Sequence, residues 1–119
     1  MNFEFIQTHA FQHEASKLGL TAEDVRAIEN QISDDPRRWP VMSGAPGLRK
    51  MRFAPEARSG GKSGGVRVCY FVVDQASHVF LVTVFGKNEK QNLEAADRNA
   101  IKAWMTRIRK TYEQGNDDV

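Results

Sequence analysis

The sequence predicts an α+β fold: a small, twisted, mainly antiparallel sheet with an N-terminal helix hairpin and a C-terminal helix. Three observations indicate this class. Apolar residues recur at helical spacing in the first 35 residues, residues 48–86 contain three runs rich in β-branched and aromatic residues, and helical spacing returns after residue 92. The predicted order is β-α-α-β-β-β-α in a single domain of residues 1–114, followed by a disordered tail of residues 115–119.

The N-terminal third predicts one strand and two helices. Residues 3–6, FEFI, are typical of a short strand, and a helix with one buried face follows, ended by Gly19. Its apolar residues stand at i, i+4 and i+7: Phe11, Ala15 and Leu18. The sequence TAED at 21–24 is a capping-box pattern and predicts a second helix over residues 21–33. Residues 36–47 are rich in proline and glycine and predict a loop, with Trp39 packing back against the helices.

The remainder predicts three strands and one helix. The strands are expected at 48–54, 66–74 and 78–86, as an antiparallel meander in which DQAS forms a short hairpin connection. An amphipathic helix follows, with Asn92 as its N-cap. Its predicted buried stripe has steps of three and four residues: Leu93, Ala96, Ala100, Trp104, Ile108 and Tyr112.

Composition excludes several classes of protein. The single cysteine, Cys69, cannot form an internal disulfide, and its place in an apolar strand predicts a buried side chain. No apolar stretch approaches the roughly 18 residues of a membrane span, and the N-terminus does not resemble a signal peptide. We therefore expect a cytoplasmic protein with no membrane partner.

Charge is unevenly distributed along the chain. Residues 1–35 contain two basic and seven acidic side chains, residues 73–119 contain seven of each, and residues 36–72 contain eight basic side chains and one acidic one. The eight are Arg37, Arg38, Arg49, Lys50, Arg52, Arg58, Lys62 and Arg67. Because this excess straddles two strands and a glycine-rich loop, it favours polyanion binding over a merely solvated face.

Strand alternation concentrates part of this charge on one surface. Lys50 and Arg52 point to one face while Met51 and Phe53 point to the other, and Arg67 on the next strand is expected to join the two cations. Arginine and lysine can bind a phosphodiester and offset charge in its transition state.

Other functional motifs are weak. Lys62, in SGGKSGG at 59–65, does not belong to a nucleotide-binding P-loop, because a strand follows it where a P-loop has a helix. His9 and His13 have metal-compatible spacing but lack an accompanying motif, so we expect two surface histidines, no metal site and no cofactor. Tyr70 and Tyr112 are expected to pack in the core.

Three motifs occur in order within residues 47–93: GLRKMR, GKSGGVRV and GKNEK. Together they resemble the RelE/ParE toxin superfamily, and most closely its HigB-like, ribosome-dependent members. The resemblance implies a RelE-like fold and the toxin of a type II toxin–antitoxin system, a metal-independent endoribonuclease that cleaves mRNA in the ribosomal A site. It also implies a cognate antitoxin as partner, of the helix-turn-helix, HigA-like kind, besides the ribosome and mRNA.

The resemblance also implies residue roles. In such enzymes the 2′-hydroxyl attacks the adjacent phosphate, and basic residues replace the usual histidines. By motif the catalytic residues are Lys50, Arg52, Arg67 and Lys87, and the RNA-binding residues are Arg49, Arg58, Lys62 and Lys90.

The chain departs from the family pattern in its tyrosines. RelE uses a tyrosine shortly after the closing motif, which this chain lacks, and many HigB-like members have tyrosine where this chain has Phe85. The general acid or base therefore stays unassigned. Two alternatives remain open, a ParE-like inhibitor of DNA gyrase and a non-catalytic nucleic-acid-binding domain.

Overall fold

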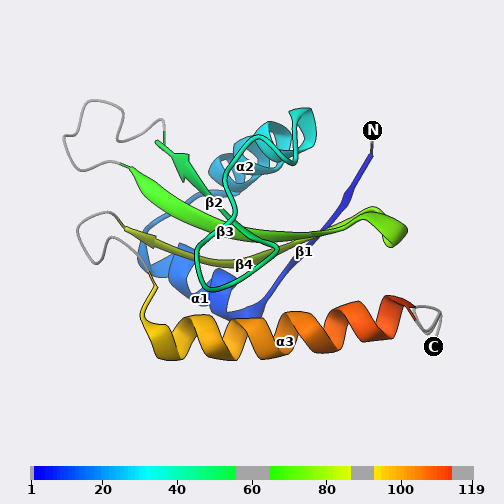
Figure 1. Ribbon diagram of the computed structural model, residues 1–119. Coiled ribbons are helices and arrows are strands. Elements are labelled where there is room, and N and C mark those ends of the chain that lie inside the picture. The colour runs from blue at the N-terminus through cyan, green and yellow to red at the C-terminus, as the bar shows by residue number, and fades with distance from the viewer. Residues whose placement is uncertain (1, 56–64, 87–92, 114–119) are drawn as a thin grey trace.

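A four-stranded sheet with helices on both faces forms the protein in this computed structural model (Figure 1). The structure describes residues 2–55, 65–86 and 93–113. The strands are β1 (Glu4–Gln7), β2 (Leu48–Phe53), β3 (Val66–Val73) and β4 (His78–Gly86), and the helices are α1 (His9–Lys17), α2 (Ala22–Asp34) and α3 (Ala95–Glu113). This order confirms the predicted α+β class.

The sheet has the strand order β1-β4-β3-β2. β2, β3 and β4 form the expected antiparallel meander, and β1 adds in parallel to β4, with Glu4 opposite His78. A 3-10 helix, Asp74–Ala76, and the left-handed Ser77 connect β3 to β4. A register shift between Cys69 and Tyr70 marks an irregularity in the β3–β4 ladder.

Both N-terminal helices begin with side-chain caps. The backbone N–H of Phe11 donates to Thr8 Oγ1 at 3.0 Å. At the start of α2, the predicted capping box is present, with reciprocal hydrogen bonds of 3.0 and 2.9 Å between Thr21 and Asp24. Gly19 follows α1 with φ +75°, a left-handed conformation that glycine adopts without steric cost, and confirms the predicted end of that helix.

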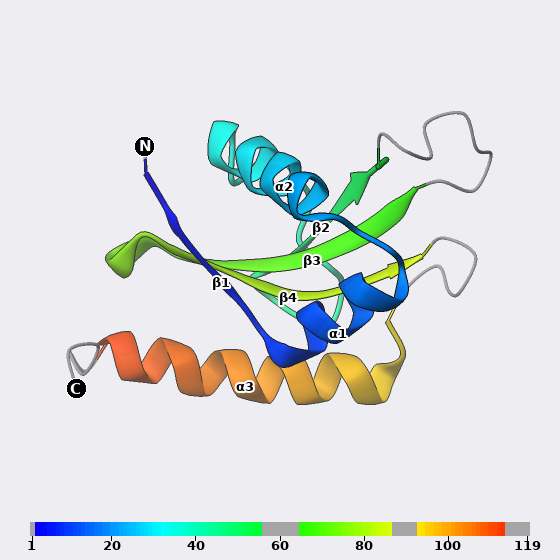
Figure 2. The same cartoon turned by 180° about the vertical axis from the view of Figure 1, so that it is seen from behind.

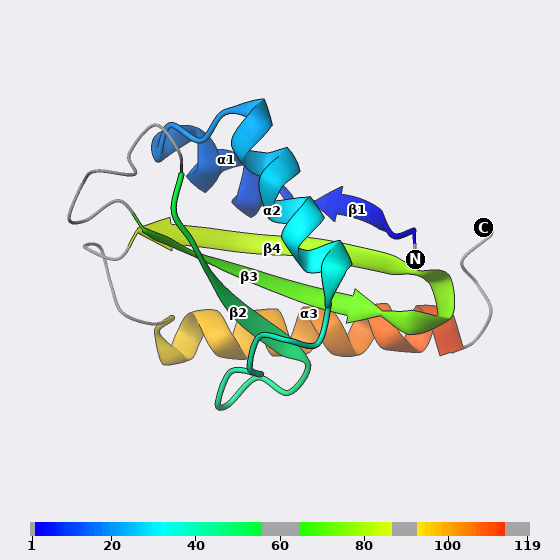
Figure 3. The same ribbon diagram turned by 90° about the horizontal axis from the view of Figure 1, so that it is seen from above.

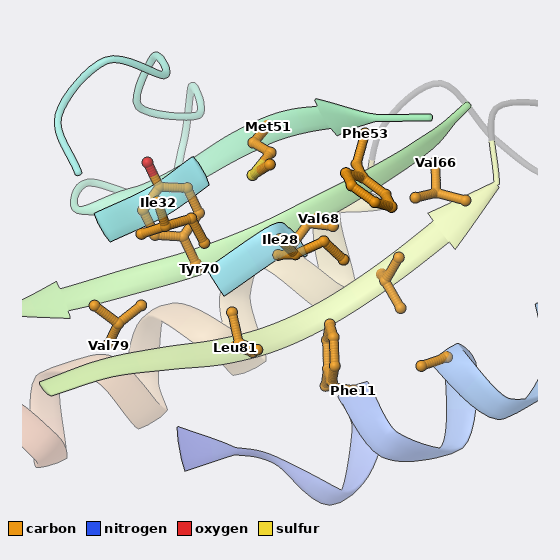
Figure 4. Close-up of a cluster of buried hydrophobic side chains, with 12 residues drawn as sticks. Phe11, Ile28, Ile32, Met51, Phe53, Val66, Val68, Tyr70, Val79 and Leu81 are labelled. Atoms are coloured by element: carbon orange, nitrogen blue, oxygen red, sulfur yellow. The ribbon is translucent and has the colours of Figure 1, made fainter. Parts of the chain in front are cut away.

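The first core cluster lies between the sheet and the α1–α2 hairpin (Figure 4). Its fully buried side chains come from both helices and from three strands: Phe11, Ile28, Ile32, Met51, Val68, Tyr70, Val79, Leu81 and Val84. Tyr70 donates its hydroxyl hydrogen to the Pro36 carbonyl at 2.7 Å. Trp39 packs against this cluster, as expected.

The second core cluster lies under α3, on the opposite face (Figure 2). Met105 is fully buried, and the Trp104 ring contacts the rings of Phe80 and Phe71 edge to face, with centroids 5.3 and 6.2 Å apart. Cys69 belongs to this cluster and is buried, which confirms its expected role.

The predicted buried stripe of α3 was wrong at its two alanines, whereas Leu93 is buried as predicted. Ala96 and Ala100 are exposed, and Ile101 and Met105 take part in the packing instead. The predicted cap Asn92 lies outside the described residues. The prediction counted alanine as a buried apolar residue. Alanine favours a helix on either its buried or its exposed face, so its position does not indicate which face is buried.

Residues 36–47 cross the outer edge of β2 from one layer to the other (Figure 3). Met42 donates its N–H to the Leu48 carbonyl at 2.7 Å, and Lys50 donates its N–H to the Pro40 carbonyl at 3.1 Å. The crossing segment therefore pairs with an edge that would otherwise be open to other strands. No helix among the described residues has both the length and the apolar character needed to cross a bilayer.

Candidate nucleic-acid interface

Alternation along β2 separates its charged residues from its core residues. Met51 is fully buried and Phe53 is 6% exposed in the cluster under α1 and α2. Arg52 is exposed and Lys50 is partly exposed on the other face. The predicted orientation of both pairs is confirmed, because successive side chains of a strand point to opposite faces.

Pairing of β2 with β3 brings the third predicted cation to the same face. Arg67 lies directly opposite Arg52, and Lys50 lies opposite Cys69, which is buried under α3. We call Lys50, Arg52 and Arg67 the basic face. It lies on the α3 side of the sheet, toward the end where β2 and β4 finish and α3 begins (Figure 1).

Arg52 and Arg67 are like charges at directly opposite positions of the β2–β3 ladder. Like charges directly opposite each other on neighbouring antiparallel strands destabilise the pair. Among the described residues, no salt bridge joins Arg52 or Arg67 to a carboxylate. The fold therefore keeps two opposed guanidinium groups at a cost that a bound anion would offset.

Other arginines of the basic segment hold the chain together. Arg49 points away from the basic face, and its Nη1 donates to the carbonyls of Trp39 and Arg37 at 2.6 and 3.2 Å. Arg37 forms an ion pair with Asp74. These contacts hold the segment that crosses the β2 edge, so part of the basic excess is structural. The RNA contact of Arg49 stays a prediction, and it would have to be made from the opposite face.

Four of the predicted site residues lie outside the described residues: Arg58, Lys62, Lys87 and Lys90. The described residues that flank them lie at one end of the sheet. Phe53 is opposite Val66 in the β2–β3 ladder, and Val66 is opposite Gly86 in the β3–β4 ladder. Phe53, Val66 and Gly86 therefore lie next to Arg52 and Arg67 in the sheet.

Tyr70 is excluded as the general acid or base of a reaction on the basic face. Tyr70 is buried on the opposite face, and desolvation raises the pKa of its phenol to about 12. The predicted core role is confirmed. Tyr112 bonds to His78 at the beginning of β4, whereas the basic face lies near its end.

Register revealed one neighbour that the sequence did not. Phe85, the position that carries tyrosine in many HigB-like members, lies directly opposite Arg67 and is 2% exposed. No local pattern could have paired these residues, because register depends on two separate segments.

His9 and His13 are both exposed on α1, and no group of three or more potential metal ligands occurs in the part of the chain that is described.

A groove of about 680 Å³ opens between α1, β4 and α3. Its lining is mostly apolar and includes Val82, Phe85, Ile101 and Trp104, with Glu14 and Asp97 among the polar residues. A second, shallower pocket of about 450 Å³ lies between α1 and α2. The linings of these two pockets, taken from the described residues, do not include Lys50, Arg52 or Arg67.

Comparison with known proteins defines the fold class as RelE-like. No family model matches the chain. A chain of the intact E. coli RelBE toxin–antitoxin complex is 23% identical with a TM-score of 0.54, and the match covers 71% of this chain and 95% of that one. Isolated E. coli RelE is 22% identical with a TM-score of 0.52, covering 86% of this chain and 98% of RelE. A mutant of E. coli RelE in the free state is 17% identical with a TM-score of 0.50, covering 76% and 90%.

These neighbours confirm the RelE-like fold that the sequence predicted. The closer resemblance to HigB-like members stays a prediction.

Proposed function

We propose that this chain is the toxin of a type II toxin–antitoxin system, a ribosome-dependent endoribonuclease that cleaves mRNA in the A site. One observation carries the proposal: a RelE-like fold places Arg52 and Arg67 directly opposite each other beside Lys50. Two opposed cations with no carboxylate partner among the described residues match a dianionic or phosphodiester ligand.

The reaction assigned to this site is attack of a ribose 2′-hydroxyl on the adjacent phosphate. The 2′-oxygen forms a bond to phosphorus, the bond from phosphorus to the 5′-oxygen of the next nucleotide breaks, and that oxygen leaves as a hydroxyl after taking up a proton. Arg52 and Arg67 hold the phosphate oxygens and stabilise the negative charge that grows in the transition state. Lys50 lies two residues before Arg52 on the same face and serves to activate the 2′-hydroxyl, with Lys87 as a further cation. The ribosome supplies the geometry of the message, which makes positioning the larger part of catalysis.

Partners follow from the same proposal. RelE is known in a complex with its antitoxin. We infer a cognate antitoxin for this chain as well, of the helix-turn-helix, HigA-like kind, and action in the cytoplasm, where ribosome and mRNA are found. Arg49, Arg58, Lys62 and Lys90 would contact ribosomal or messenger phosphates.

Primer extension on a reporter message after brief induction of the chain tests this function. Wild type should produce new cuts within codons, and Arg52→Ala or Arg67→Ala should abolish them. A reporter without its start codon should stay intact. Arg26→Ala is the matched control, because Arg26 is exposed on α2, across the sheet from the basic face, and should cut as wild type does.

Other outcomes would assign the chain elsewhere. Growth arrest with an intact message would refute the nuclease and favour a ParE-like gyrase inhibitor, testable by supercoiling assays. Binding of RNA without arrest or cleavage would favour a non-catalytic nucleic-acid-binding domain. Cuts that persist without translation would refute the dependence on the ribosome.

A further inference from the structure

Three side chains from distant parts of the sequence form a hydrogen-bonded chain at the other end of the sheet. His78 begins β4, Glu4 begins β1 directly opposite it, and Tyr112 lies in the last turn of α3. His78 Nδ1 is 2.7 Å from the Tyr112 hydroxyl oxygen, and His78 Nε2 is 3.0 Å from Glu4 Oε1. Figure 1 shows the end of α3 on the same side of the molecule as the β3–β4 hairpin.

This order of groups is that of an activated nucleophile. In the imidazole tautomer that carries its hydrogen on Nε2, the carboxylate of Glu4 can accept that hydrogen, and the Nδ1 lone pair can accept the hydroxyl hydrogen of Tyr112. A nucleophile bonded to a base that is oriented by a third group is the arrangement of enzymes that attack electrophiles through a hydroxyl.

The second tyrosine of the chain provides an internal contrast. Tyr70 also donates its hydroxyl hydrogen, but to the carbonyl of Pro36. A carbonyl accepts a hydrogen bond without taking the proton, and burial raises the pKa of Tyr70 to about 12. Only Tyr112 has a base in contact, and its side chain is partly exposed, as is His78.

We propose that Tyr112 is an activated phenol and a site of covalent modification by phosphoryl-class electrophiles, with His78 as base and Glu4 as its orienting group. In the reaction, the Tyr112 oxygen forms a bond to phosphorus, the bond from phosphorus to its leaving group breaks, and the phenolic proton passes to His78 Nδ1. The natural donor class is a nucleoside triphosphate, whose leaving group is the nucleoside diphosphate.

A fluorophosphonate probe tests the proposal with the full-length chain. The phenol displaces fluoride, and peptide mapping by mass spectrometry reports the rate at each tyrosine. Tyr112 should be labelled at least about a hundredfold faster than N-acetyltyrosine amide, which is the lower end of what a positioned base supplies. Tyr70 should stay unlabelled in the folded protein.

Two variants distinguish a His78 that takes the proton of Tyr112 from a His78 that only holds Tyr112 in place by a hydrogen bond. In His78→Asn the amide oxygen can still accept a hydrogen bond near the Nδ1 position but cannot take the proton, so labelling of Tyr112 should fall about tenfold or more. Glu4→Gln leaves the imidazole in place and should lower the rate by a smaller factor, because it weakens only the orientation of His78. Circular dichroism and thermal melting establish that each variant is folded.

The proposal fails if native Tyr112 reacts no faster than N-acetyltyrosine amide, or if folded His78→Asn reacts as fast as wild type. Should His78→Asn not fold, wild type in urea provides the comparison. Unfolding separates the three groups, so labelling of Tyr112 should then fall to the rate of the free amino acid derivative. An unchanged rate on unfolding would refute activation by the fold.

Discussion

The opposed arginines predict an uncommon result, namely that substitutions which abolish activity should stabilise the protein. Arg52 and Arg67 lie directly opposite each other in the β2–β3 ladder without a carboxylate partner among the described residues. Two unit charges about 6 to 10 Å apart in water repel by about 0.4–0.7 kcal/mol. This agrees with the roughly 0.2–1 kcal/mol found for cross-strand pairs.

Glutamine is the appropriate replacement, because it keeps much of the side-chain stem and removes only the charge. Arg52→Gln or Arg67→Gln should each raise the free energy of unfolding by about 0.5 kcal/mol, which corresponds to roughly 2–3 °C in Tm for a domain of this size. The double variant should gain little more than either single one, because the first substitution already removes the repulsion.

Thermal and urea unfolding at low and high salt measure the effect. The gain should shrink in 1 M salt, where the Debye length falls to about 3 Å. Arg26→Gln, across the sheet on α2, is the control and should show no such gain. If both single substitutions destabilise the protein at low salt, or if the double variant shows no coupling, the opposed charges are not a cost of the fold and the argument for an anion site loses its main support.

Three further predictions concern stability. Gly47→Ala should cost about 1–3 kcal/mol, chiefly because Gly47 has φ +95°, a conformation that strains an L side chain, and in addition because an added Cβ would meet Arg109 Nη2. Adding Arg109→Ala should relieve part of this cost, and Gly65→Ala, whose Cβ would meet only ordinary contacts, is the control. Because the pKa of Tyr70 is raised to about 12, stability should fall by roughly 2 kcal/mol between pH 10 and 12 as the unfolded chain loses this proton first, and Tyr70→Phe should remove this fall. Thr21→Ala should cost about 1 kcal/mol by breaking the capping box of α2.

Urea unfolding checks all three, and each has a contrary result. Equal costs for Gly47→Ala with and without Arg109 would show that the clash is absent. A pH profile of Tyr70→Phe that matches wild type above pH 10 would assign the alkaline loss to other groups. A Thr21→Ala variant as stable as wild type would mean that water replaces the cap without cost.

Local patterns in the sequence determined the elements and the faces of the basic strand. Alternation of Lys50 and Arg52 with Met51 and Phe53 needs only the period of a strand, and the Thr21 cap needs only four consecutive residues. Strong apolar side chains marked α3 correctly, whereas its alanines did not, since alanine favours the helix without specifying a face.

Only the tertiary structure decided which distant residues meet. The pairing of Arg67 with Arg52, the use of Arg49 to hold the crossing segment, and the chain from Glu4 through His78 to Tyr112 each join segments far apart in sequence. Register and long-range contact arise from the packing of whole elements, and a shift by one residue would move every side chain of a strand to the other face. The sequence by itself therefore specified which residues carry charge and where strands and helices form, and the packing of those elements decided which charges act together.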